Sequence, residues 1–245
     1  MNLRQSLLQH EKPTHQFHDR DSLMWLISHR PKRLPKSLIL PKKLVETIQK
    51  NKPWDCLEDR WFTNDLIRDG MHGFRHVSRV SVLATYLALS RFSLSQKELS
   101  AIMFSCLFHD CRRKNDNADP RHGERAALWL KRNRDVLPKE LQSFLPAICF
   151  SISVHNDPYD QLLKTDSYRK FGLFVDVLKT ADALDRYRFP KADWWISEKF
   201  IVLLPHDKEM AFAFDLAYQS EYSFVGTGNS KQAMLRSWNN LSSKK

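Results

Sequence analysis

Metal-ligand side chains recur along about a hundred residues of this 245-residue chain. Two of them, His109 and Asp110, are adjacent and end the apolar run 101–108. Burying two polar side chains at the end of such a run is costly unless each finds a partner. A metal ion is such a partner, because imidazole nitrogen and carboxylate oxygen together suit divalent first-row metals. The candidate ligands are His76, His109, Asp110, His122, His155 and Asp182.

The composition is typical of a globular protein built mainly from helices. Hydrophobic residues make up 42% of the chain and charged residues 27%, which argues against disorder. Glycine occurs only 6 times, whereas residues that favour helices, such as leucine, alanine, lysine and arginine, are frequent. We therefore predict an all-α protein. A helical metal-binding domain over 57–190 is expected to lie between a basic N-terminal extension, 1–56, and a C-terminal extension, 191–245, packed on that domain.

Charge and cysteine content restrict the partners and the compartment. The 39 basic and 28 acidic residues give a formal net charge of +11, which favours anionic partners without choosing between nucleotides, nucleic acid and membrane phosphates. The 4 cysteines form no C-x-x-C pair, so neither a zinc ribbon nor a disulfide framework is indicated. The sequence shows no signal peptide and no apolar stretch of about 18 residues. We expect a cytoplasmic protein with reduced thiols and no membrane contact.

Helix signals surround the first half of the ligand set. After His76, apolar residues three and four positions apart form one helical face, so His76 is expected near a helix start. The sequence from Ser95 to Glu98 has the spacing of a capping box. It opens a second predicted helix that runs to Asp110.

The later candidates also fall near predicted helix ends. Asp119 as N-cap and Pro120 at the first helical position predict a helix with His122 in its first turn. Two more helices are predicted over 138–155 and 167–188, and each contains a candidate ligand.

The N-terminal extension carries prolines that break any long helix. A short helix is expected from Lys42 to about Lys50. Basic residues crowd the segment 30–43, and this pattern fits either a solvated arm or a contact with phosphates. We interpret it as a solvated arm.

The C-terminal extension is harder to interpret. The apolar segments 199–204 and 210–216 are separated by a proline-bearing turn, and they fit either a β-hairpin or two short helices. We favour the hairpin. From Gly226 onward we expect a loop and a tail.

The order of these motifs resembles the HD-domain superfamily of metal-dependent phosphohydrolases. Its signature is a histidine, a later His-Asp pair and a final aspartate on a downstream helix. The matching segments are 73–80, 107–110 and 180–185, and the resemblance spans about half the chain, 65–188. A second His-Asp doublet, 206–207, lies in the proline-bearing turn beyond the last matching helix, so we do not expect it to bind metal.

The resemblance implies one or two divalent transition metal ions, Mn, Fe, Co, Ni or Zn. Dinuclear branches of the superfamily add two histidines between the His-Asp pair and the last aspartate, and His122 and His155 occupy that interval. This implies two ions, with Asp110 bridging them. A mononuclear site is the alternative, with these two histidines binding substrate phosphate or transferring protons.

Basic residues near the ligands are candidates for binding substrate. Arg112 and Arg113 directly follow the His-Asp pair, and guanidinium groups form forked hydrogen bonds to phosphate oxygens. With Asp110 they form the predicted catalytic set, and both arginines, His72 and Arg186 form the predicted substrate-binding set. An ordinary surface role is the alternative for the arginines. Asp185 follows the last ligand by three residues, and it either orients a ligand, pairs with Arg186 or lies on the helix surface.

The predicted function is hydrolysis of a phosphoester in a nucleotide or a related phosphorylated small molecule. The hydrolysis would use water activated by the metals. One alternative within the same fold is a di-iron oxygenase similar to myo-inositol oxygenase. Another is a non-enzymatic module that binds a nucleotide, or a nucleic acid through the basic segment 30–43. The sequence does not identify the substrate, the native metal or the oligomeric state.

Overall fold

The structure is a computed structural model that describes residues 18–196 and 201–243. Over these residues it contains α-helices and short 3-10 helices and no strand, which confirms the all-α prediction. None of the described helices is long and apolar enough to cross a membrane.

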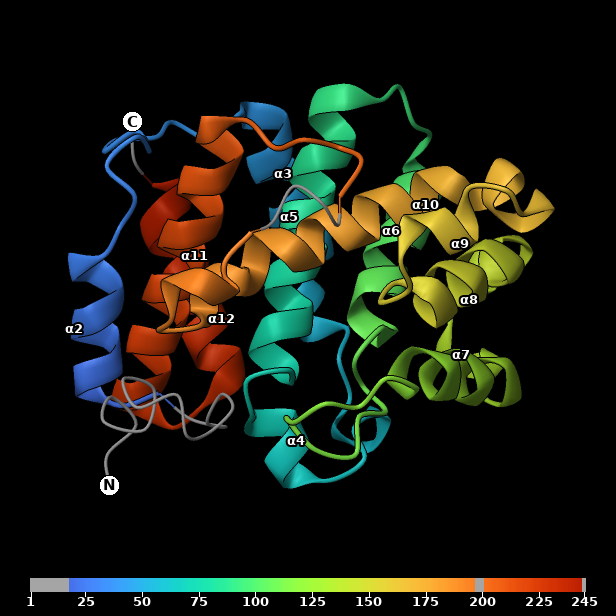
Figure 1. Cartoon of the computed structure of the whole chain (residues 1–245), viewed down its shortest axis with the longest axis horizontal. Coiled ribbons are helices and arrows are strands. Elements are labelled where there is room, and N and C mark those ends of the chain that lie inside the picture. The colour runs from blue at the N-terminus through green and yellow to red at the C-terminus, as the bar shows by residue number, and fades with distance from the viewer. Residues whose placement is uncertain (1–17, 197–200, 244–245) are drawn as a thin grey trace.

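Helix α5 (Phe74–Arg91) forms the centre of the molecule (Figure 1). Every residue from Phe74 to Ala88 is buried, as expected of a helix that is surrounded by other helices. On one side α5 contacts α6 (Gln96–Phe108) and α10 (Asp166–Leu184), and on the other it contacts α11 (Asp207–Thr227) and α12 (Ser230–Ser242).

The remaining helices pack around this bundle. Before α5 in the chain they are α2 (Arg20–Ser28), α3 (Lys42–Asn51), η1 (Pro53–Asp55), η2 (Asp59–Trp61) and α4 (Asp65–Asp69). After α6 they are α7 (His122–Arg132), η3 (Arg134–Val136), η4 (Lys139–Phe144), α8 (Leu145–Val154), α9 (Tyr159–Leu162), η5 (Asp185–Arg188) and η6 (Ala192–Trp194).

Two predicted helix starts have different outcomes. The capping box at Ser95 and Glu98 is present and opens α6. The predicted N-cap at Asp119 is wrong, because α7 begins at His122 with Arg121 in the cap position. The Asp119 carboxylate instead accepts the backbone N–H of Lys114 and pairs with Arg125, so it fixes the preceding loop.

The favoured β-hairpin is wrong over the part that the structure describes. Its second segment, 210–216, lies inside α11, and residues 199 and 200 of its first segment lie outside the described residues. The run fits a helix because it continues for several turns against α5, and a capping box formed by His206 and Glu209 starts it. The predicted tail is also helical, since Gly228 ends α11 at φ 64° and Asn229 caps α12.

The basic segment 30–43 is only partly solvated. The guanidinium of Arg30 donates to the carbonyl groups of Leu34 and Pro35 and lies 3.4 Å from Asp215 of α11. These contacts fasten the segment to the bundle. Helix α3 confirms the short helix predicted from Lys42.

Candidate metal centre

The six predicted ligands come together where the ends of five helices meet. His76 lies in the first turn of α5 and His122 opens α7, whereas His109 and His155 directly follow α6 and α8. Asp110 is the next residue after His109, and Asp182 lies in the last turn of α10. The ligand atoms form three overlapping groups that could each hold a metal ion, namely His76/His109/Asp110, His109/His155/Asp182 and Asp110/His122/His155.

Asp110 lies between two pairs of histidines. Its Oδ1 atom is 2.8 Å from Nε2 of His122 and 3.7 Å from Nε2 of His155. Its Oδ2 atom is 3.5 Å from Nε2 of His76 and 3.8 Å from Nε2 of His109. One carboxylate therefore presents one oxygen to each pair, which is the arrangement by which a carboxylate bridges two ions.

Asp182 lies next to the histidine pair formed by His76 and His109. Its Oδ1 atom lies 3.3 Å from Nε2 of His76 and 3.9 Å from Nε2 of His109. Unlike the other ligands, the Asp182 side chain is 33% exposed. The centre is therefore open to solvent on the side of α10.

Each histidine is fixed through its other ring nitrogen. Nδ1 of His109, of His122 and of His155 donates to the carbonyl oxygen three residues earlier, on Cys106, Asp119 and Ile152 respectively. Nδ1 of His76 lies 2.7 Å from a carboxylate oxygen of Asp185. Because a carbonyl or carboxylate oxygen accepts, a proton is assigned to Nδ1 of each ring, and Nε2 is the atom that faces the centre.

The Nε2 atoms face one another at short range. Nε2 of His76 is 3.1 Å from Nε2 of His109, and Nε2 of His122 is 2.8 Å from Nε2 of His155. At these distances the two nitrogens of a pair share a proton or a cation, because two unprotonated nitrogens would repel. In the described structure the buried Oδ1 of Asp110 also accepts no hydrogen bond. The nitrogen and oxygen donors therefore fit divalent transition metals.

The electrostatics of the centre keep its acids ionised. Burial opposes ionisation of Asp110, but His122, Arg113 and His109 hold the pKa of its carboxyl well below the usual range. The imidazoles of His76 and His109 act in the same direction on the pKa of Asp182. Anionic carboxylates are the forms that bind metal.

The two histidines of the first pair differ in their electrostatics. Burial lowers the pKa of His109 to about 3, so this ring is neutral and suited to bind metal. Burial also opposes the charge of His76, yet the hydrogen bonds that its ring donates to the surrounding carboxylates raise its pKa to about 9. A cation that binds at His76 therefore displaces a proton.

Two of the predicted substrate-binding residues lie beside the ligands. Nδ1 of His72 is 2.8 Å from a carboxylate oxygen of Asp116, and the His72 ring meets the ring of His76 edge-on at 5.8 Å. Burial lowers the pKa of His72 to about 4. Nη1 of Arg113 lies 3.6 Å from Oδ1 of Asp110.

The other two predicted arginines are placed differently. Arg112 donates to the carbonyl of Trp61 and lies over the ring of Trp129, so its guanidinium is not brought together with the ligands. Arg186 donates to the carbonyl of Trp194. It does not pair with Asp185 in the contacts described, but it lies at the mouth of the centre.

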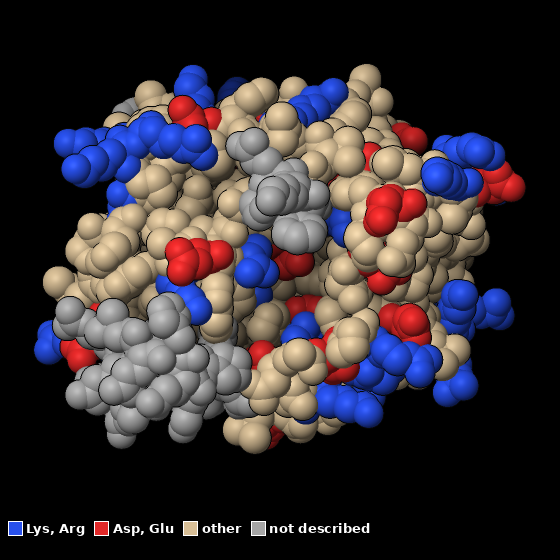
Figure 2. Space-filling model, viewed as in Figure 1, with Lys and Arg blue, Asp and Glu red and all other residues tan. Residues whose placement is uncertain are grey.

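A cavity of about 700 Å³ opens on the candidate metal centre. The candidate ligands His155 and Asp182 form one part of its wall, and Tyr159, Trp195 and Arg186 form another. On the face viewed in Figure 2, a hollow near the middle contains both acidic and basic side chains. A cavity that combines aromatic rings with charges of both signs suits an anionic ligand that also carries polar groups.

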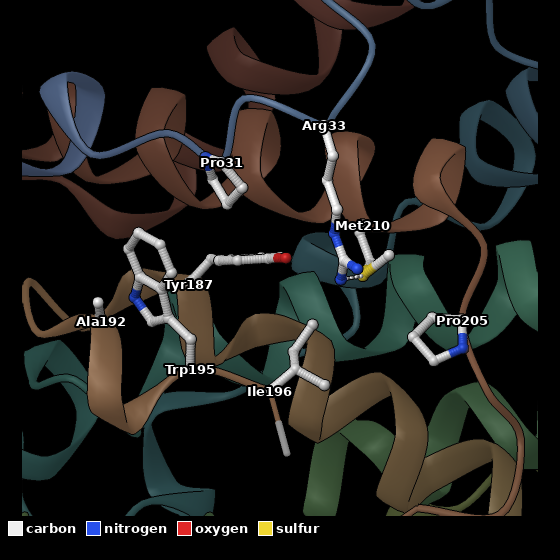
Figure 3. Close-up of a pocket in the computed structure, with 8 residues that line it drawn as sticks. All are labelled: Pro31, Arg33, Tyr187, Ala192, Trp195, Ile196, Pro205 and Met210. Carbon is white, nitrogen blue, oxygen red and sulfur yellow. Dashed lines mark hydrogen bonds between the residues drawn. The ribbon is translucent and has the colours of Figure 1, made fainter. Parts of the chain in front are cut away.

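A smaller cavity of about 230 Å³ lies on the other side of Trp195 (Figure 3). Arg33 of the basic segment reaches into it and donates to the sulfur of Met210. The hydroxyl of Tyr187 points toward the same guanidinium in Figure 3.

The second His-Asp doublet lies on the surface, away from the cluster. The side chains of His206 and Asp207 are 77% and 54% exposed. Asp207 lies 3.8 Å from Arg33. This doublet starts α11, and it is absent from the groups that could hold a metal.

Sequence reasoning missed three buried residues that support the ligands. Asp116 holds His72 and also accepts the backbone N–H of Met71. Arg79 and Glu221 connect Asp185 to α11. The position of Arg79, three residues after His76 on the same helix, is a signal that could have been used. No local pattern connects Glu221 to residues that lie more than 140 positions earlier.

Comparisons of this chain with protein-family models, curated proteins and solved structures found no match. The helical fold and its His/Asp cluster are compatible with an HD-type domain. The assignment to that superfamily therefore depends on the residues themselves.

Proposed function

We propose that this chain is a metal-dependent phosphohydrolase of the HD type that binds two divalent ions. The observation that carries the proposal is the position of Asp110, whose two carboxylate oxygens face two different histidine pairs. A single ion would use one of these pairs and leave the other pair of histidines without an ion.

The six ligands divide into two sets that share Asp110. His76, His109 and Asp182 would hold one ion, and His122 and His155 the other. When bound, two divalent ions lower the pKa of water toward about 7 and offset the negative charge of a phosphoryl group. The proposed cofactor is a pair of transition metal ions such as Mn, Fe, Co, Ni or Zn, because the donors are mixed nitrogen and oxygen.

The surrounding residues would bind and orient the phosphoester. Arg113 lies beside the bridging carboxylate, where its charge offsets charge that develops on a phosphoryl oxygen. His72, held by Asp116, faces the His76 side of the centre. Arg186 would contact the substrate from the cavity wall.

The catalytic and substrate-binding roles predicted for Arg112 stay predictions. Its guanidinium would have to leave the carbonyl of Trp61 to reach a bound phosphate. The proposed substrate is an anionic phosphorylated small molecule, and a nucleotide is one member of that class.

The test uses the second His-Asp doublet as an internal control. The double variant H109Q/D110N removes two ligands, and H206Q/D207N makes the same changes at the exposed doublet. Protein purified without chelators is assayed for bound metal and for phosphoester cleavage with added Mn, Co, Ni or Fe. The readout is phosphate release for a panel of phosphomonoesters and formation of the monoester for cyclic phosphodiesters.

We expect metal-dependent cleavage in the wild type and in H206Q/D207N, and loss of both bound metal and cleavage in H109Q/D110N. Equal cleavage by both variants would contradict the proposal. Two irons per chain with oxygen consumption and no phosphoester cleavage would replace it with the oxygenase. Absence of bound metal under every condition would contradict both enzymes.

A further inference from the structure

The four histidines of the metal centre are not oriented in the same way. Three of them donate through Nδ1 to backbone carbonyl groups close by in their own chain segments. His76 donates to the side chain of Asp185, which is an anion and lies where α10 ends and η5 begins. The orientation of His76 therefore depends on how Asp185 itself is held.

Asp185 is held by a fully buried arginine. Nε of Arg79 donates to its Oδ1 at 2.6 Å, and Nη2 donates to its Oδ2 at 2.9 Å. The Oδ2 atom is the one that also accepts from His76. Arg79 and Asp185 side chains are both 0% exposed, so this pair has no water to compensate for a lost partner.

The same arginine is shared with a glutamate of α11. Nη1 of Arg79 donates to Oε1 of Glu221 at 2.6 Å and to the hydroxyl of Ser220 at 2.9 Å. Oε2 of Glu221 accepts from Nε of Arg75 at 3.0 Å. Arg75 continues to α12, where it donates to the hydroxyl of Ser230.

This buried network carries more positive than negative charge. Arg75, Arg79 and Arg188 face two carboxylates, Asp185 and Glu221, with Arg188 3.5 Å from Oδ2 of Asp185, and all five side chains are at most 2% exposed. Neutralising Glu221 leaves a further buried positive charge without a carboxylate partner, which is costly in this setting. Asp185 is then the carboxylate that remains for Arg79. We expect the pair between Arg79 and Asp185 to strengthen and the hydrogen bond from His76 to Asp185 to weaken.

We propose that Glu221 is a positioning residue of the metal centre. Through Arg79 and Asp185 it holds His76, so the ion bound by His76, His109 and Asp182 depends on α11. The ion bound by His122 and His155 does not share this dependence, because backbone carbonyl groups orient those rings. This inference rests on the metal centre of the proposed function and not on its phosphoester chemistry.

The chain offers a matched control on the same helix. Glu209 is also a buried glutamate of α11, and it pairs with Arg91 and accepts from Ser90. It has no described contact with the network around Asp185. The variants E221Q and E209Q therefore remove equivalent charges, and only E221Q alters the support of His76.

The experiment is a calorimetric titration of Mn²⁺ into full-length protein from which metal has been removed. In the wild type we expect two binding steps. In E221Q we expect one step to weaken by about tenfold, the lower end of the effect of losing an outer partner of a ligand. The other step, and both steps in E209Q, should keep their wild-type affinities.

The same titration in a His122→Gln background identifies the affected ion. His122 belongs only to the group with Asp110 and His155, so this background removes a ligand of the second ion, and adding E221Q should weaken the step that remains. If each binding step of E221Q has the same Mn²⁺ affinity as in E209Q, the inference is wrong, although the binding of two metal ions still holds. Failure of the wild type to bind Mn²⁺ at all would instead overturn the metal centre and with it the proposed function.

A second variant separates the charge from the space that Glu221 fills. The double variant R75Q/E221Q removes one charge of each sign, so the network keeps the net charge that it has in the wild type. We expect it to recover most of the lost Mn²⁺ affinity, and it also serves if E221Q alone does not fold. If the double variant binds Mn²⁺ as weakly as E221Q does, the inference is wrong.

Discussion

Oδ2 of Asp185 lies 2.7 Å from Nδ1 of His76, so the residue after α10 orients a ligand in the first turn of α5. A carboxylate behind a histidine ligand fixes the tautomer of the ring and increases the basicity of its other nitrogen. This hydrogen bond connects α5 with the end of α10 beside the candidate metal centre, to which both helices contribute ligands.

Asp185→Asn tests the importance of this contact. The amide keeps the size of the side chain but removes the anion that faces His76 and Arg79. We expect metal affinity in the His76 set to fall by about 10–100-fold, measured by Mn²⁺ titration. Asp176→Asn is the control, because Asp176 also lies on α10 but binds the hydroxyls of Tyr159 and Tyr168. Equal affinities in the two variants would show that the contact with His76 has no effect on binding.

Gly123 allows α7 to approach the end of α8. A Cβ at this position would lie 2.5 Å from the carbonyl oxygen of Ile152 and 3.0 Å from Nδ1 of His155. We expect Gly123→Ala to displace that ligand and to destabilise the fold by about 1–3 kcal/mol, as overpacking does.

The matched control is Gly226→Ala near the end of α11, where an added Cβ meets nothing within 4 Å. This change should be neutral or stabilise the protein by up to about 1 kcal/mol, because alanine favours helices. Thermal unfolding of both variants checks the prediction. It is wrong if Gly123→Ala is as stable as Gly226→Ala and binds the second ion with unchanged affinity.

His72→Gln should separate substrate binding from metal binding. His72 contacts Asp116 and the ring of His76, but it belongs to none of the three groups of residues that could hold an ion. We expect both ions to be retained and kcat/KM for phosphoester cleavage to fall by about tenfold, a loss of ~1.4 kcal/mol. The exposed His29 gives the control variant His29→Gln. Loss of an ion in His72→Gln would assign His72 to the ligands instead.

The stability contributed by Glu221 should depend on pH. Burial opposes its ionisation, but Arg75 and Arg79 hold the pKa of its carboxyl far below the usual 4.5. A carboxyl with a lowered pKa in the folded state stabilises the protein fully above its unfolded-state pKa, and this stability is lost as the pH falls toward the folded-state value. The difference in unfolding free energy between wild type and E221Q should therefore be largest above about pH 5.5 and should shrink below about pH 4.5.

Chemical denaturation of both proteins between pH 3 and pH 7 measures this difference. A constant difference over the whole range would mean that Glu221 is stabilised by packing and not by its charge. The metal-free protein should be used, because bound ions add a pH dependence of their own.

Several helices were predictable because they depend on local patterns. The apolar spacing after His76 and the capping box at Ser95 describe single helices, and these formed as predicted. The six ligands were proposed from their order and helical context together with the resemblance to the HD-domain superfamily, and the structure brings all six together.

The features that were not predictable depend on distant contacts. The segment 210–216 fits a strand or a helix equally well until its packing against α5 is known. The direction of a surface arginine is equally non-local, since Trp61 and Trp129 turn Arg112 away from the ligands. Glu221 carries no sequence signal, because its partners lie on another helix far away in the chain.

The number of divalent ions bound per chain tests the central claim most directly. Elemental analysis of wild-type protein saturated with Mn²⁺ and then freed of excess metal should give two ions per chain, and the variant H122Q/H155Q should retain one. One ion in both proteins would contradict the bridging role of Asp110 and support a mononuclear site. No bound ion in either protein would contradict the metal centre itself.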